Sequence, residues 1–218
     1  MELEGEARQQ ITTRYLEART PAAIAEAAEW LKQGQLVVFP TDTLYGIGAD
    51  AFNPAAVLRL YQVKQRPRAK GIPILLADPE DLTQVVERVP AFARTLIAQF
   101  WPGPLTLVLP RSARLPGIIS PDDSVAVRIP GSETTRALIR AAGGAVATSS
   151  ANRSGQPPAR DGTQALRELG GLVAAVLDDG PSPGQLASTI VDCTGDLPRI
   201  LRRGPIPAEA LQWTAAKR

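Results

Sequence analysis

Short runs of consecutive apolar residues recur along this chain and alternate with segments of helical periodicity. One run, LVVF, covers residues 36–39, and two others, LTLVL and VAVRI, cover residues 105–109 and 125–129. Short runs of this kind are typical of strands that are covered on both faces. Because the runs are interleaved with helical segments, the sequence predicts an α/β domain made of packed layers.

The other predicted elements continue this alternation through most of the chain. Strands are also expected at residues 72–76, 145–149, 173–177, 188–192 and 199–202. Helices are expected after Thr20, after Asn53, after Asp78, over 90–100 and over 132–144, where a capping residue or a proline marks each start. Residues 157–162, PPARDG, are predicted to be a loop.

Composition excludes several kinds of catalytic site. The chain has 218 residues, 44% of them hydrophobic, and a formal net charge of +2, which indicates a globular protein without a general basic coat for nucleic acid. It contains no histidine, which excludes Ser-His-Asp and Cys-His catalysis and histidine-based metal sites. The single cysteine, Cys193, excludes an internal disulfide and a multi-cysteine metal cluster.

The compartment is predicted from the cysteine and from the apolar pattern. Cys193 follows Ile190 and Val191, so we expect a buried free thiol in a strand, which fits a reducing compartment. No apolar run approaches the roughly 20 residues that span a bilayer. The first ten residues are charged and unlike a signal peptide. The sequence therefore predicts a cytoplasmic protein with no membrane partner.

Polar clusters follow or interrupt several of the predicted strands. Residues 40–46 (PTDTLYG) and 149–155 (SSANRSG) follow strands, Arg128 lies inside one, and Ser188 and Thr189 begin another. In open α/β sheets, ligands bind outside the strand ends, where such loops gather. The structural alternatives are proline or Ser/Thr turns for the two loops and a buried ion pair for Arg128. Both interpretations stay open at this point.

The segment KQRPRAK, residues 64–70, concentrates positive charge on a bend. Lys64, Arg66, Arg68 and Lys70 have no acidic residue among them, and Pro67 ends the preceding helix. Such cations suit a polyphosphate, whereas the structural alternative is a solvated basic loop. Neither a Walker A motif nor a GxGxxG fingerprint is present, because GIGADAF lacks the required lysine and the third glycine.

Seven motifs occur in an order that resembles one family. They are FPTDTLYGIGADA, YQVKQRPRAKG, WPGPLTLVLP, SVAVRIP, TSSANRSG, STIVD and ILRRG, and together they span roughly residues 20 to 206. This set resembles the YrdC/Sua5/TsaC family, the L-threonylcarbamoyladenylate synthases. The resemblance implies the YrdC-like fold, a twisted mixed β-sheet flanked by helices around a concave basic cavity. It implies the short single-domain form, with an N-terminal extension (1–19), a catalytic domain (20–206) and a C-terminal tail (207–218).

The resemblance also implies a reaction and its partners. L-threonine, bicarbonate and ATP would give threonylcarbamoyl-AMP and pyrophosphate, for the threonylcarbamoyl modification of a tRNA adenosine (t6A). A separate complex would transfer the group to tRNA, so tight tRNA binding is not expected. Mg²⁺ is expected to arrive with ATP, without a metal site of the protein. The alternative is an RNA-binding or ribosome-assembly module without ATP turnover, whose RNA affinity would fall steeply with salt.

Position by position, the resemblance implies two groups of site residues. The threonine group is Thr41, Thr43, Arg128, Thr148 and Ser188, with Arg128 as the clamp on the carboxylate. The ATP group is Lys64, Arg66, Lys70, Ser124, Ser150, Asn152 and Arg202, of which Lys64 and Arg66 are also expected to be catalytic. Arg68 is expected to remain in solvent. Leu75 and Pro158 depart from the longer members, which have a histidine near the threonine and a serine near the nucleotide.

The absence of histidine fits this chemistry because the substrates supply their own nucleophiles. The amine of threonine attacks an activated carbonate or carbon dioxide, and the resulting carbamate attacks the α-phosphorus. The protein must gather three reactants that repel one another. Two unit charges 4 Å apart cost about 4 kcal/mol at an effective dielectric constant of about 20. Cationic side chains that cancel this repulsion and align the reactants are expected to supply most of the rate.

Overall fold

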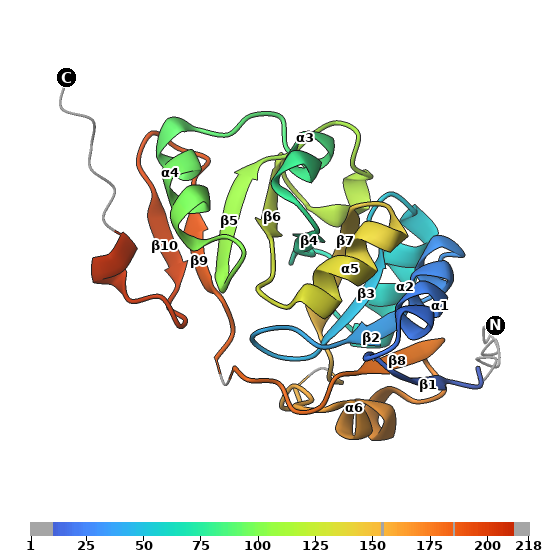
Figure 1. Ribbon diagram of the computed structural model, residues 1–218. Helices are drawn as coiled ribbons and strands as arrows, with labels where there is room; N and C mark the ends of the chain where they lie inside the picture. The colour runs from blue at the N-terminus through green and yellow to red at the C-terminus, as the bar shows by residue number, and fades with distance from the viewer. Residues whose placement is uncertain (1–10, 154, 185, 212–218) are drawn as a thin grey trace.

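The chain folds around a single mixed sheet in the computed structural model, which describes residues 11–153, 155–184 and 186–211 (Figure 1). The strands are β1 (Arg14–Glu17), β2 (Val37–Phe39), β3 (Gly46–Asp50), β4 (Ile74–Leu76), β5 (Leu105–Pro110), β6 (Ser124–Arg128), β7 (Ala145–Ser150), β8 (Ala175–Asp178), β9 (Thr189–Asp192) and β10 (Arg199–Arg202). Their order across the sheet is β1-β8-β2-β3-β7-β4-β6-β5-β9-β10. Pairing is parallel at β1–β8, β2–β8, β4–β6 and β5–β9 and antiparallel at the other junctions.

Helices flank this sheet, and their starts follow the capping signals in the sequence. They are α1 (Pro21–Lys32), α2 (Pro54–Lys64), α3 (Leu82–Val85), α4 (Ala91–Phe100), α5 (Glu133–Ala142) and α6 (Gly162–Leu169), with 3₁₀ helices η1 (Pro79–Asp81), η2 (Gly117–Ile119) and η3 (Ala208–Leu211). The Thr20 hydroxyl accepts from the backbone N–H of residue 23, and the Asn53 side chain accepts from those of residues 55 and 56. A proline that has no N–H to satisfy follows each of these two caps.

The α/β architecture expected from the sequence is confirmed. Each strand predicted from an apolar run is present, as β2 and as β4 to β10. Besides the short 3₁₀ helices, three elements lie outside the sequence prediction: β1, β3 and α6. Strand β1 falls in the segment expected to be an N-terminal extension, where it pairs in parallel with β8. The expected C-terminal tail contains η3, and its residues 212–218 lie outside the described part of the chain.

Alternation along the strands divides the buried side chains between two layers. The larger core cluster contains residues from α2, α4 and α6, among them Leu60, Leu96 and Leu169. The smaller cluster contains Leu31 from α1 and Leu138 from α5, which pack against each other's helices. Helices α1 and α5 therefore cover part of one face of the sheet, and α2, α4 and α6 cover parts of the other.

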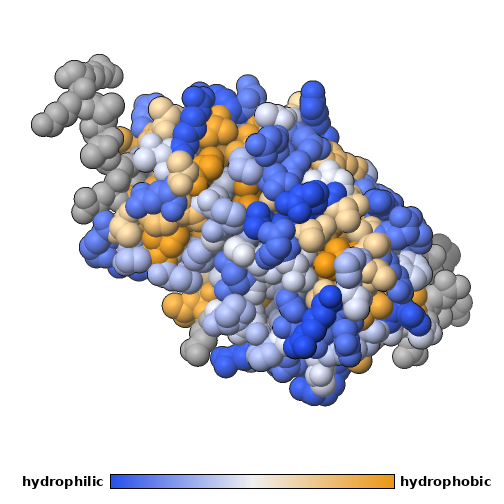
Figure 2. Space-filling model, in the orientation of Figure 1, coloured by the Kyte–Doolittle hydropathy of each residue, from blue (hydrophilic) through white to orange (hydrophobic). Residues whose placement is uncertain are grey.

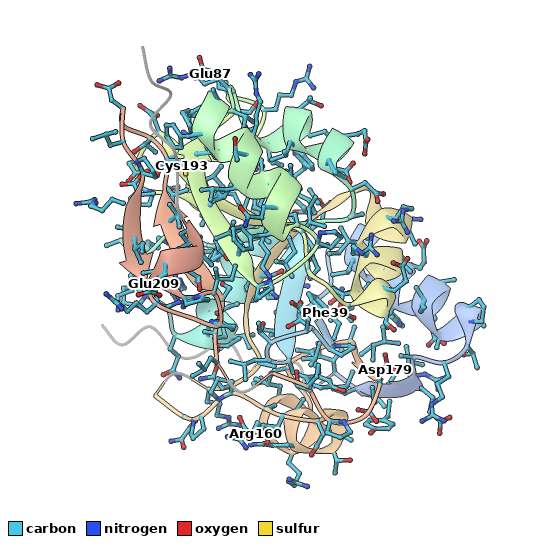
Figure 3. All side chains as sticks on the ribbon, turned by 60° about the vertical axis from the view of Figure 1, so that its left-hand side comes forward. Phe39, Glu87, Arg160, Asp179, Cys193 and Glu209 are labelled. Carbon is cyan, nitrogen blue, oxygen red and sulfur yellow. The ribbon has the colours of Figure 1, made fainter. Side chains whose placement is uncertain are left out.

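Strand β3 contains two glycines because neighbouring side chains leave little room for a Cβ atom. A Cβ on Gly48 would lie 2.5 Å from Val146 Cγ1 and 2.7 Å from Phe39 Cε1. On Gly46 it would lie 3.0 Å from Thr148 Cγ2. Phe39 lies well inside the molecule, where Figure 3 labels it. The GIG pattern is therefore a packing feature of the sheet.

The surface differs between the centre and one end of the sheet. On the face drawn in Figure 2, hydrophilic residues cover the centre, and hydrophobic residues gather over α4 and the β9–β10 pair. Large exposed hydrophobic residues at this end include Leu197 and Leu201. Within residues 11–153, 155–184 and 186–211, no helix combines the length and the apolar character that a membrane crossing requires.

Candidate functional site

Polar side chains gather on one face of the central strands because each strand alternates between its two faces. In β6, Val127 belongs to the larger core cluster, so the next residue, Arg128, points to the opposite face. Leu75 in β4, Thr106 in β5 and Thr148 in β7 each follow a residue of the same core cluster. All four side chains therefore share one face of the sheet.

These side chains contribute to a cavity of about 430 Å³. Its lining residues are Thr41, Thr43, Leu44, Tyr45, Gly46, Arg66, Pro73, Leu75, Thr106, Arg128, Thr148, Ser149, Ser150, Pro158, Ala187, Ser188, Ile190 and Arg202. Three of them are arginines and none is acidic. Guanidinium forks combined with hydroxyl groups suit ligands that carry carboxylate or phosphate.

The loop after β2 is organised by the hydroxyl of Thr41. Thr41 Oγ1 accepts from the backbone N–H groups of Thr43 and Leu44, at 3.1 Å each, and donates to the Leu44 carbonyl over 2.6 Å. The Thr43 hydroxyl lies 3.0 Å from Thr41 Oγ1 and is also buried. The Ser/Thr turn considered as a structural alternative is therefore present, and it sets Thr43 in the cavity wall.

Arg128 is held in place by one acceptor on each of its nitrogens. Nε donates to the Gly103 carbonyl over 2.9 Å, Nη1 to Thr43 Oγ1 over 3.0 Å and Nη2 to Asp42 Oδ1 over 2.5 Å. Burial lowers the pKa of the Arg128 guanidinium, and the Asp42 carboxylate opposes that shift. A guanidinium has five N–H donors, so one on Nη1 and one on Nη2 remain for a ligand. The ion pair considered as an alternative is thus compatible with a binding role.

Ser188 and Arg202 form a second polar group in the cavity. Arg202 donates from Nε to the Ser188 carbonyl over 3.0 Å and from Nη2 to Ser188 Oγ over 3.1 Å. Ser188 Oγ also lies 2.7 Å from Thr106 Oγ1. Burial lowers the pKa of the Arg202 guanidinium, and the positive charge of Arg128 lowers it further. A bound anion near these two guanidinium groups would relieve their repulsion.

Lys64 holds the loop that follows β7. Its side chain is buried, and its ammonium donates to the Ser150 carbonyl over 2.6 Å and to both the carbonyl and the side-chain oxygen of Asn152 over 2.5 Å. The Ser150 hydroxyl donates to the same Asn152 oxygen over 2.6 Å. Burial lowers the pKa of the Lys64 ammonium to about 8, and the charge of Arg66 adds to the shift. Lys64 therefore lies behind the cavity wall rather than in its lining.

The rest of the basic segment is held by hydrogen bonds from Arg66 to backbone carbonyls a few residues further along the chain. Arg66 lines the cavity and donates from Nε and Nη2 to the carbonyls of Lys70 and Gly71, over 2.9 Å and 2.6 Å. Burial lowers the pKa of the Arg66 guanidinium. Arg68 and Lys70 are exposed, which for Arg68 is the position expected from the sequence.

The structure brings most of the expected site residues to this one cavity. Those in its lining are Thr41, Thr43, Arg66, Arg128, Thr148, Ser150, Ser188 and Arg202, and those outside it are Lys64, Lys70, Ser124 and Asn152. Asn152 lies directly behind the lining, in the loop that Lys64 holds. Ser124 donates to the Asp122 carboxylate over 2.6 Å.

Three further residues of the lining are Leu75, Thr106 and Pro158. Leu75 and Pro158, which depart from the longer family members, both line the cavity. Thr106 lines it as well and lies outside the sequence prediction. Its side chain is only 4% exposed. The one signal that could have indicated it is a single hydroxyl inside the otherwise apolar run at residues 105–109.

The sequence matches one family model and many relatives. The Sua5/YciO/YrdC model, described as telomere recombination, matches residues 29–204. A relative from Mycobacterium tuberculosis is 44% identical over 86% of this chain and 87% of its own length. The threonylcarbamoyl-AMP synthase of Bacillus subtilis is 38% identical over 87% of this chain, which spans 55% of that longer protein.

Solved structures share the arrangement of sheet and helices. Sua5 of Pyrococcus abyssi, crystallised in complex with L-threonine, has a TM-score of 0.86 and 36% identity over 90% of this chain and 58% of its own. YciO of E. coli has a TM-score of 0.81 over 94% of this chain and 100% of its own, at 22% identity. The second match supports the fold alone.

Proposed function

This chain belongs to the Sua5/YciO/YrdC family, and on that premise we propose that it is a threonylcarbamoyl-AMP synthase. The reaction joins L-threonine, bicarbonate and ATP into threonylcarbamoyl-AMP and pyrophosphate, for the t6A modification of tRNA. Relatives from Bacillus subtilis and Pyrococcus abyssi carry this enzyme's name, and the Pyrococcus abyssi protein binds L-threonine.

The observation that carries the proposal is the set of groups that line the cavity. Arg66, Arg128 and Arg202 bring three guanidinium groups to a hollow of about 430 Å³ that contains no acidic lining residue. The three reactants are anionic or carry an anionic group, and they must lie within bonding distance of one another. Fixed cations cancel their repulsion before the reaction begins and need no rearrangement during it.

We assign the amino acid to the part of the cavity around Arg128. The two free N–H donors of this guanidinium match a carboxylate, and the Thr43 hydroxyl lies 3.0 Å from Nη1 beside them. Thr148 and Ser188 contribute hydroxyl groups to the same lining. The amine of threonine bonds to the bicarbonate carbon, water leaves, and a carbamate results.

We assign the nucleotide to the part of the cavity around Arg66, Ser150 and Arg202. A carbamate oxygen attacks the α-phosphorus, the bond from that phosphorus to the bridging oxygen breaks, and pyrophosphate leaves. Arg66 and Arg202 neutralise the phosphate charge during this step. Lys64 acts from behind the wall, because its ammonium fixes the loop of Ser150 and Asn152 and adds positive charge to it.

The other partners follow from the chemistry of this reaction. Mg²⁺ enters as the complex with ATP and is part of the substrate, which suits a metal that keeps water and phosphate ligands. The product carries a reactive mixed anhydride and passes to a separate complex that modifies tRNA, so this protein need not bind tRNA tightly. We place the reaction in the cytoplasm, where ATP and tRNA are found.

The direct test is pyrophosphate release by the purified protein. We expect release when MgATP, L-threonine and bicarbonate are all present, together with a product of the mass of threonylcarbamoyl-AMP, and none when any one reactant is omitted. Arg128→Ala should raise the KM for threonine far more than the KM for ATP. Arg14→Ala removes an exposed arginine of β1 and should change neither constant.

The rival function makes the opposite prediction for the same sample. An RNA-binding module would release no pyrophosphate with the complete mixture. It would instead bind RNA with an affinity that falls steeply between low and moderate salt. That pair of results would overturn the proposed enzyme.

A further inference from the structure

Two buried hydroxyl groups face each other in the cavity, one on β5 and one directly before its neighbour β9. Thr106 Oγ1 in β5 and Ser188 Oγ, one residue before β9, are 2.7 Å apart, and the two residues are 4% and 5% exposed. Both residues line the cavity. Their neighbours along the chain, Ala187 and Ile190, are apolar and also line the cavity, and Arg202 donates to Ser188.

The hydrogen bonds around this pair leave one hydroxyl proton for a ligand. Ser188 Oγ accepts from Arg202 Nη2 over 3.1 Å. One proton serves the bond between the two hydroxyls, whichever oxygen donates it. Within the part of the chain that the structure describes, neither hydroxyl has another acceptor. A buried O–H group normally finds a partner, so an acceptor atom of a ligand is expected beside the pair.

In the sheet, Arg128 lies between Thr106 on one neighbouring strand and the apolar side chain of Leu75 on the other. Leu75 in β4 is the parallel partner of Arg128 in β6. On the other side, Leu107 pairs with Val127, and the same antiparallel register continued by one residue sets Thr106 opposite Arg128. Leu75, Arg128 and Thr106 therefore form a row across one face of the sheet.

We propose that Thr106, together with Ser188, is a specificity-determining residue that recognises the side-chain hydroxyl of the amino acid substrate. The inference rests on the proposed function, which sets the substrate carboxylate on Arg128. A β-hydroxy amino acid held there carries its hydroxyl and its methyl on the same carbon, and the two groups diverge. The hydroxyl faces the Thr106–Ser188 pair, and the methyl faces Leu75 and Pro73.

The proposal predicts that the protein prefers threonine to an analogue without the side-chain hydroxyl, and that this preference depends on the hydroxyl of Thr106. A site that hydrogen-bonds a substrate hydroxyl discriminates against the analogue that lacks it, because buried polar groups are then left without partners. L-2-aminobutyrate is such an analogue, since it has the carbon skeleton of threonine without the hydroxyl. Thr106→Val replaces the protein's hydroxyl with a methyl group of similar size.

The test compares threonine with L-2-aminobutyrate in the pyrophosphate assay, using the wild-type chain, Thr106→Val and Thr106→Ser. We expect the wild type to favour threonine in kcat/KM. Thr106→Val should lower the ratio of kcat/KM for threonine to kcat/KM for L-2-aminobutyrate by about tenfold or more, chiefly because kcat/KM for threonine falls. Thr106→Ser keeps the hydroxyl and should keep most of the ratio. The KM for ATP should stay unchanged in both variants.

Calorimetric titration of the same three proteins with each amino acid gives a readout that does not need turnover. Circular dichroism and a melting curve check that each variant is folded. A ratio in Thr106→Val equal to that of the wild type would overturn the assignment. An equal fall in kcat/KM and in affinity for both amino acids would also overturn it, because a merely structural role for Thr106 predicts that result. If the wild type releases no pyrophosphate and binds neither amino acid, the proposed function fails and this assignment fails with it.

Discussion

Arg128 in the cavity wall forms an ion pair with Asp42, which lies outside the lining, with Nη2 and Oδ1 2.5 Å apart and side chains that are only 7% and 19% exposed. Asp42 fixes one end of a guanidinium whose other nitrogens are held by Gly103 and Thr43. The pair therefore orients the clamp while leaving two of its N–H donors free. Removing one partner of a buried pair leaves the other charge without compensation.

Asp42→Ala should therefore lower the free energy of unfolding by about 3 kcal/mol, the range found when one partner of a buried pair is removed. Urea denaturation measures this change. The matched control is Glu26→Ala, which breaks the pair with Arg14, whose side chains are 38% and 59% exposed. This control should lose less than about 1 kcal/mol. Equal losses in the two variants would show that burial of the Asp42 pair has no energetic consequence.

Gly184 packs against the loop that carries Thr41 and Thr43, and Gly184→Ala should disturb threonine binding. A Cβ at this position would lie 2.6 Å from the Asp42 carbonyl oxygen and from Thr43 Cα. Both contacts are with backbone, so the loop must shift. We expect the KM for threonine to rise by roughly tenfold, as for a moderate overpacking strain.

The control for this prediction is Gly195→Ala, because a Cβ on Gly195 would meet no atom within 4 Å. Steady-state kinetics with threonine as the varied substrate compares the two variants. Gly195→Ala should match the wild type. An unchanged KM in Gly184→Ala would mean that the loop moves aside without affecting the amino acid.

Lys64 should make nucleotide binding sensitive to alkaline pH. Its pKa is lowered to about 8, chiefly by burial, so its ammonium loses a proton as the pH rises through this value in the free protein. The neutral amine has one fewer donor and no charge, which loosens the Ser150–Asn152 loop. The KM for ATP should therefore be constant below pH 8 and rise above it, by up to about tenfold per pH unit.

Two measurements check this prediction. In the wild type, the KM for ATP is followed between about pH 6.5 and 9.5. A flat profile would contradict a role for the Lys64 charge. Lys64→Arg keeps a positive charge at every pH in this window and should abolish the alkaline rise. A rise of the same size in that variant would assign the titration to another group.

Cys193 should be inert toward thiol reagents in the folded protein. Burial raises the pKa of its thiol from an ordinary 9.0 to about 12, and the Asp192 carboxylate adds to the shift. The thiolate is the reactive form, so at pH 8 its population is lower by roughly a thousandfold. Figure 3 labels this residue at the β9–β10 end of the molecule, and its side chain is inaccessible to solvent.

Iodoacetamide labelling followed by mass spectrometry measures this reactivity. The folded protein at pH 8 should react at least about a hundredfold more slowly than the same protein in denaturant. Cys193→Ser should take up no label in either condition, since the chain has one cysteine. Cys193 directly follows β9, so rapid labelling of the folded protein would show that this end of the strand opens readily.

The apolar runs predicted most of the sheet because a strand covered on both faces needs consecutive apolar residues. Strand β3 escaped prediction because Gly46 and Gly48 lower its strand propensity. The reason for these glycines, the side chains of Phe39 and Thr148, lies in other strands and is visible only in three dimensions. Helix α6 escaped because it is short and follows a proline-rich loop.

The site residues were predicted from the family motifs rather than from a physical pattern. The motifs could not distinguish residues that line the cavity from residues that hold its loops in place. Arg128 stood out as a charged residue inside a strand. Lys64 belongs to the same basic segment as Arg66, yet its ammonium points to loop carbonyls while Arg66 reaches the cavity. Thr106 was hidden because a single threonine in an apolar strand is as common in cores as in sites. Only the partner strand, with Ser188, reveals it.

The wide spacing of the cavity residues along the chain decides when during synthesis the cavity can be complete. The first and last described strands, β1 and β10, form the two edges of the sheet, and the cavity needs residues from Thr41 to Arg202. A nascent chain therefore has an open, unfinished hollow until its final strand leaves the ribosome. A ligand that contacts residues from both ends of this range can therefore stabilise only chains in which β9 and β10 have already joined the sheet.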